Sequence, residues 1–170
     1  MASLIEELIT VLEEENEEYK KLMVLSKEKT PVIVKGNTEK LKEITGMEQE
    51  HIQVLNSLEK RRIEVIKDMA LVLNKKEEEL TVKTIVGLLE GQDKERKKLA
   101  EVHDSLKQTL DNISVINDMN KNLITSSLEM VEFNINMYKS MYQAPETGNY
   151  DKNAYNTEST MSYGVFDAKN

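Results

Sequence analysis

Apolar residues recur along most of this chain at alternating spacings of three and four positions, the period of an amphipathic α-helix. The first such segment runs from about Ser3 to Lys29. Ser3 followed by Glu6 has the pattern of a capping box, so we expect the helix to begin there. Pro31 is expected to end or kink it, because proline offers no backbone N–H and disfavours a helical Thr30. The expected apolar face carries Leu4, Leu8, Leu12, Tyr19, Leu22 and Leu25.

The sequence does not determine the conformation of the connection after this helix. Residues 30–37 contain Pro31 and a short apolar run, and they fit either a helical turn or an extended linker. Gly36 then indicates a turn, and Asn37 or Thr38 can accept a hydrogen bond as the N-cap of the next helix.

Three further helical segments follow. We expect a second helix over about Thr38 to Lys76, a short one capped by Thr81 and ended by Gly91, and a last one over about Gln92 to Gln143. Long helices joined by a short connection pack side by side and antiparallel. The predicted fold is therefore all-α. It is an elongated antiparallel hairpin or bundle of three long helices plus a short helix, with the first helix laid along the hairpin of the second and last, in a helical domain of residues 1–143.

The helical period ends at Ala144, and residues 144–170 are rich in Asn, Ser, Thr and Gly. Such a composition predicts a flexible or folded-back tail. Yet seven of the chain's eight aromatic residues lie after position 132, and plain flexible tails carry few of them. The sequence therefore favours a tail that docks on a partner or covers an apolar groove over an inert one, through Tyr150, Tyr155, Tyr163 and Phe166.

The end of the last helix is apolar on two faces. At about 100° per residue, one face carries Ile124, Leu128, Val131, Ile135, Tyr138 and Tyr142, and the second stripe carries Met130, Phe133, Met137 and Met141. A thin hairpin needs one such face. The second is either covered by the first helix or offered to a helix of another protein, for which methionine gives adaptable packing.

Composition and charge exclude several classes of function. The chain has no cysteine, which excludes disulfides, thiolate metal sites and thiol catalysis and favours a cytoplasmic protein. No run approaches the roughly 18 consecutive apolar residues of a membrane span, and the acidic N-terminus lacks the basic region of a signal peptide. A net charge of −8 argues against nucleic acid as a partner, because phosphates would repel such a surface.

Candidate chemistry is sparse. Glu48 and His51 match the Glu-x-x-His ligand pair of di-iron bundles, but His103, the other histidine, follows Ala100 at that spacing, so the motif is unpaired. We therefore expect no metal and no cofactor. The sequence contains no phosphate-binding loop and no catalytic triad, and we therefore expect that the protein is not an enzyme. A structural coiled-coil homodimer, with Glu48, His51 and Arg62 as polar register positions, remains the alternative.

Three blocks of sequence carry a resemblance to a known family. The first comprises Leu4, Leu8, Leu12, Glu15, Tyr19 and Leu22, followed by Val34-Lys-Gly-Asn37 and Leu41. The second comprises Leu55, Leu58, Glu59 and Arg62. The third is the Asn-rich run from Asn117 to Val131. In their order and spacing, the blocks resemble the FlgN family of flagellar export chaperones.

The resemblance implies a small, helical, cytoplasmic chaperone without ATPase activity. It implies that the chain binds hook-associated (hook–filament junction) proteins, prevents their premature assembly and delivers them to the export gate of flagellar type III secretion. The tail aromatics would dock on that gate or cover the client groove. We expect a monomer or weak dimer, with a homodimer or adaptor without a secretion client as the alternative. The expected client contacts are Leu128, Met130, Val131, Phe133, Met137, Tyr138, Met141 and Tyr142.

Overall fold

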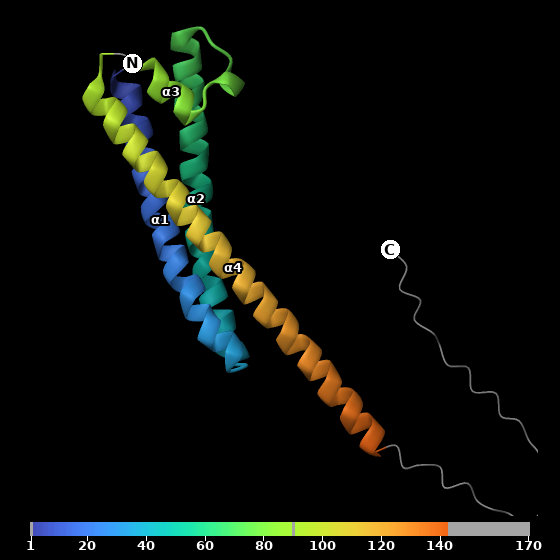
Figure 1. Ribbon diagram of the computed structural model, residues 1–170. Helices are drawn as coiled ribbons and strands as arrows, with labels where there is room; N and C mark the ends of the chain where they lie inside the picture. The colour runs from blue at the N-terminus through green and yellow to red at the C-terminus, as the bar shows by residue number, and fades with distance from the viewer. Residues whose placement is uncertain (1, 90, 143–170) are drawn as a thin grey trace, which may run out of the picture. The chain divides into compact units, whose positions relative to one another are not determined.

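The structure, a computed structural model, describes residues 2–89 and 91–142, and every secondary-structure element among these residues is a helix. The all-α prediction is confirmed. The chain divides into two compact units, Met1–Glu132 and Phe133–Asn170, and of the second the structure describes residues 133–142. The helices are α1 (Ala2–Val34), α2 (Thr38–Leu73), the 3₁₀ turn η1 (Glu77–Glu79), α3 (Val82–Leu88) and α4 (Asp93–Tyr142) (Figure 1).

The end of α1 differs from the prediction, because the helix continues through Pro31 to Val34. It ends in a Schellman motif: the Asn37 amide donates to Val32 O at 3.1 Å, and the Gly36 amide donates to Ile33 O at 3.0 Å. Gly36 supplies the positive φ of 64° that this motif requires. Pro31 removes one backbone hydrogen bond near the end of the helix, and the hydrogen bonds of the Schellman motif stabilise the turn that follows it. The start differs too: α1 begins at Ala2, so Ser3 lies inside its first turn rather than capping it.

The predicted caps of the next two helices are confirmed. The Asn37 side chain accepts from the Lys40 amide at 3.0 Å at the start of α2. Thr81 accepts from the Thr84 amide at 3.2 Å at the start of α3. The helix α2 ends earlier than expected, because Asn74 adopts a left-handed conformation with a φ of 51° and its amide turns back to Ala70 and Leu71.

Within residues 1–132, α1 and α2 form the closely packed antiparallel pair, and Figure 1 shows them side by side. Ion pairs along the pair confirm the direction, since the residue numbers of the partners on α2 fall as those on α1 rise: Arg62 pairs with Glu15 at 3.1 Å, His51 with Glu18 at 2.7 Å, and Glu48 with Lys29 at 2.9 Å. The sequence predicted the close hairpin between the second and last helices instead. The short connection of residues 35–37 holds α1 against α2, whereas residues 74–92 allow α4 a wider approach.

The helix α4 packs on α1 through a seam of polar contacts. Asn16 donates to Ser105 Oγ at 2.9 Å and accepts from Thr109 at 2.8 Å. Farther along, the Asn120 amide donates to Ser26 O at 2.7 Å. The residue numbers of the partners rise together on both helices, so α1 and α4 run parallel.

An apolar core closes the end of the first unit where α3 lies. Its buried residues come from α1, α2, α3 and α4 and from the segments that flank α3. Because the four helices share it, this core fixes where α4 starts. Its members include Ile5, Leu8, Leu12, Val65, Met69, Leu80, Ile85, Leu89, Leu99 and Leu106. A smaller cluster of Leu22, Leu55 and Ile113 lies farther along the bundle.

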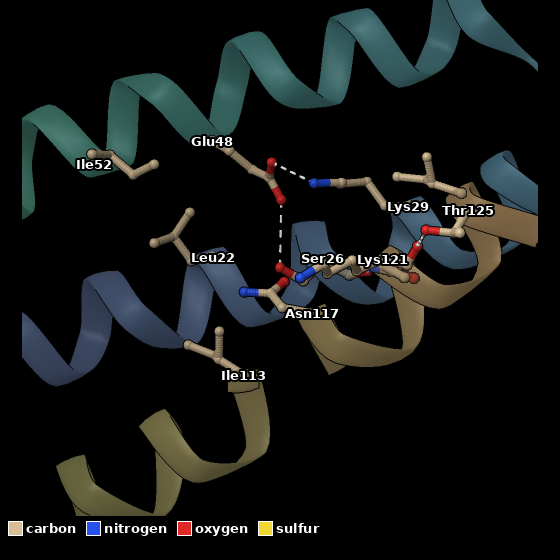
Figure 2. Close-up of a pocket in the computed structure, with 11 residues that line it drawn as sticks. Leu22, Ser26, Lys29, Glu48, Ile52, Ile113, Asn117, Lys121 and Thr125 are labelled. Carbon is tan, nitrogen blue, oxygen red and sulfur yellow. Dashed lines mark hydrogen bonds and ion pairs between the residues drawn. The ribbon is translucent and has the colours of Figure 1, made fainter. Parts of the chain in front are cut away.

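The Glu-x-x-His pair of α2 serves the packing of α1. Glu48 binds Lys29 and accepts from Ser26, while His51 binds Glu18 (Glu48 in Figure 2). Each motif residue therefore has a different α1 partner. Among the described residues, no group of three or more His, Asp or Glu side chains is placed to hold a metal ion.

Replacing Glu18 by Gln is expected to destabilise the chain in a pH-dependent way. Hydrogen bonds from Lys21 and His51 hold the pKa of the Glu18 carboxyl below its ordinary value, although burial opposes them. A lowered folded-state pKa adds stability above about pH 4.5 that is lost as pH falls through the folded-state value. We expect Glu18→Gln to cost about 0.5–1 kcal/mol at neutral pH, because the site is partly solvated. Urea unfolding measured at neutral and at acidic pH checks this.

The control for this experiment is Glu17→Gln, which removes an exposed carboxylate paired with Lys20 within α1. It should change the stability less at neutral pH. A cost of Glu18→Gln that stays constant down to pH 3 would contradict the assignment.

Candidate functional site

An apolar groove lies between the turn that joins α1 to α2 and the neighbouring stretch of α4. We call it the turn groove. It has a volume of about 250 Å³ and carries no charged side chain in its lining. One wall comes from the turn and the other from α4. Its lining residues are Val32, Ile33, Gly36, Asn37, Thr38, Leu41, Ile124, Ser127, Leu128 and Val131.

A second pocket adjoins the turn groove at Ile124 and extends along α4 toward Ile113, and we call it the central pocket. It has a volume of about 380 Å³ and is lined by α1, α2 and α4. Figure 2 shows Glu48 of α2 directed toward Lys29 and Ser26 of α1, with Leu22, Ile52 and Ile113 farther along. Unlike the turn groove, this pocket carries an ion pair in its wall. It is therefore the less apolar of the two.

The predicted client contacts in the first unit lie on exposed positions of α4. Leu128 is 60% exposed, Met130 is 68% exposed and Val131 is 53% exposed. Leu128 and Val131 line the turn groove, whereas Met130 does not. The alternative that the first helix covers the second apolar stripe is wrong for Met130, since a covered side chain would not keep this exposure.

In the second unit, residues 133–142 are helical and carry the other five predicted contacts. All five side chains are exposed there, and Tyr142 the most at 84%. Large contiguous apolar patches left in water often mark a surface used for binding. These residues are Phe133, Met137, Tyr138, Met141 and Tyr142. The four predicted tail anchors, Tyr150, Tyr155, Tyr163 and Phe166, lie outside the described residues.

The turn wall of the groove was missed by the sequence reasoning. Val32 and Ile33 belong to the short run that fits either a helical turn or a linker, and Leu41 was named only as part of the family resemblance. The signal was the apolar run after Pro31: at about 100° per residue, Ile33 continues the apolar face of α1, and it is 5% exposed. Its meaning depends on α4 lying opposite, which the sequence does not fix.

None of the described helices is long and apolar enough to cross a membrane. Within residues 1–132, the features that distinguish α4 after Ile113 are the two pockets and the exposed apolar side chains. This arrangement can hold an apolar segment of another chain.

Comparison with known proteins gives a family and one curated relative. A family model described as FlgN protein matches residues 1–158. The chain is 30% identical over 119 residues to the uncharacterized protein YvyG of Bacillus subtilis (strain 168), which covers 70% of this chain and 71% of the relative. No solved structure matches the chain.

Proposed function

This chain belongs to the FlgN family, the family of flagellar export chaperones, and we propose that it binds hook–filament junction proteins in the cytoplasm. In this role it prevents their premature assembly and delivers them to the flagellar type III export apparatus. The observation that supports the proposal best is the set of exposed apolar side chains on α4, three of them in the first unit and five in the second.

In the first unit, the proposed client contacts are Leu128, Met130 and Val131 together with the turn groove. In the second unit, they are the five exposed residues of α4. Leu128 and Val131 form the α4 wall of that groove, and Val32 and Leu41 lie on the opposite wall. An amphipathic helix binds such a groove by inserting side chains spaced three and four residues apart. Because no charged side chain lines the groove, the inserted side chains are apolar and uncharged.

Methionine suits this task. Met130, Met137 and Met141 are all exposed, and methionine's unbranched side chain adapts to differently shaped partners. A chaperone that serves more than one junction protein needs such adaptability.

Light scattering coupled to size exclusion tests this function. The free protein is expected to elute with the mass of one chain, 19.6 kDa, or as a weak, concentration-dependent dimer. With a junction protein of the same organism it should form a complex of one chain of each. A stable homodimer that takes up no junction protein would instead support the structural coiled coil, in which a second copy covers α4.

The tail aromatics are a separate part of the proposal. They dock on the export gate or cover the client surface when no client is present. If they cover it, deletion of residues 144–170 is expected to tighten client binding several-fold, because an intramolecular competitor has been removed. A calorimetric titration of the shortened chain measures this. Unchanged or weaker binding would leave docking on the export gate as the role of the tail.

A further inference from the structure

The attachment of α4 to α1 changes character along the helix. Leu99 and Leu106 anchor the start of α4 in the apolar core, and Ile113 in the smaller cluster. From 114 to 132, Asn120 is the one buried residue, at 3% exposed, with Ile116 and Leu123 partly buried beside it. An apolar attachment is therefore followed by a polar one.

Asn120 uses both ends of its amide on α1. Its nitrogen donates to Ser26 O at 2.7 Å, and its oxygen accepts from Thr30 Oγ1 at 2.7 Å. A buried asparagine satisfied in this way fixes one register between two helices, because any other register leaves the amide unpaired. It does so with little net stabilisation, since water offers the same hydrogen bonds when the helices separate.

The space on both sides of Asn120 is poorly filled. The central pocket borders it directly, lined by Asn117, Asn120 and Lys121. The turn groove begins at Ile124, which lines both pockets. Side chains beside such space forgo the dispersion contacts that hold packed helices together. Asn120 therefore fixes the register in which residues 114–132 dock on α1, and apolar packing stabilises this docking only weakly.

We propose that Asn120 is a polar latch: residues 114–132 of α4 open from α1 as a unit when a client binds, and the two pockets then join into one larger groove. This inference rests on the proposed function, whose client site it regulates. Opening leaves no buried group unpaired on α1, because the Thr30 hydroxyl can donate to Ser26 O, four residues earlier in its own helix. Closing restores the same register through the same two hydrogen bonds.

Two variants move the latch in opposite directions. Thr30→Val keeps the shape of the side chain and removes the donor to Asn120 Oδ1, so it favours opening. Asn120→Leu replaces the amide by an apolar side chain of similar size in the lining of the central pocket, so it favours closure. Asn122→Leu is the matched control: Asn122 is exposed and lines neither pocket, so it reproduces the gain in helix propensity alone.

Hydrogen exchange of the free full-length protein measures how often residues 114–132 open when no client is present. An undocked helix of this length is marginal, so undocking accelerates exchange of its amides. Amides of 114–132 should exchange on the order of tenfold faster than those of 99–113. Thr30→Val should accelerate them further, and Asn120→Leu should slow them while Asn122→Leu does not. Equal exchange in the two stretches, or equal effects of the two leucine variants, would overturn the latch.

Titration with a junction protein then tests whether client binding requires the opening of residues 114–132. Asn120→Leu should weaken the complex on the order of tenfold relative to Asn122→Leu, and Thr30→Val should tighten it. Slower exchange in Asn120→Leu with unchanged client affinity would overturn the regulatory role. If the unchanged protein binds no junction protein, the proposed function fails, and the exchange contrast alone decides whether the latch exists.

Discussion

Changing Leu128 and Val131 together to Asp is expected to weaken client binding by at least about 100-fold, because interface anchors are each worth about 2 kcal/mol or more. Both side chains line the turn groove, where a client would bury the new carboxylates without a partner. Both are more than half exposed in the free protein, so the helix should tolerate the change. Calorimetric titration gives the affinity, and circular dichroism checks that the helix content is retained.

The matched control changes Val115 and Met119 to Asp. These residues lie on the same helix, are 70% and 45% exposed and line neither pocket. The control adds the same two charges, so it accounts for any general repulsion of an acidic client. Equal loss of binding in both double variants would contradict the location of the client surface.

The largest loss of stability is expected from Leu8→Ala. Leu8 of α1 is 0% exposed in the apolar core that the four helices share. Truncation removes apolar burial and leaves a cavity, at a cost of about 2–5 kcal/mol. Leu71→Ala makes the same chemical change where the side chain is 74% exposed, and it should cost less than about 0.5 kcal/mol. Urea unfolding compares the two, and similar losses would contradict the assignment of the core.

Local features of the fold were predictable because their causes are local in sequence. The period of apolar residues gave the four helices, and side-chain capping gave the starts at Asn37 and Thr81. The start of α4 was predicted to within one residue, at Gln92 against the observed Asp93. Pro31 misled the prediction, because the Schellman motif that ends α1 farther on depends on Gly36.

Features that depend on tertiary partners were not predictable. Asn16, Ser26 and Asn120 are buried, although polar residues are usually placed on the outside of such helices. Their burial is acceptable because they satisfy one another and Thr109 across α1 and α4. The close pairing of α1 with α2 was not predictable for the same reason. It follows from the lengths of the two connections between the long helices rather than from the pattern of apolar residues.

The candidate site was predictable in part. The apolar faces at the end of the last helix identified the α4 side of the surface, and the structure leaves those side chains exposed. Their role in binding a client stays a prediction. The turn wall with Val32 and Leu41 required a structure, because it is a groove only in relation to α4.

The central claim is that α4 holds a junction protein, and a calorimetric titration with the junction proteins of the source organism tests it most directly. The comparison is a chain with Phe133→Asp and Met137→Asp, two exposed residues of the second unit. The account predicts tight one-to-one binding by the unchanged protein, and none by the double variant at equal helix content. No binding by the unchanged protein, or equal binding by both, would contradict it.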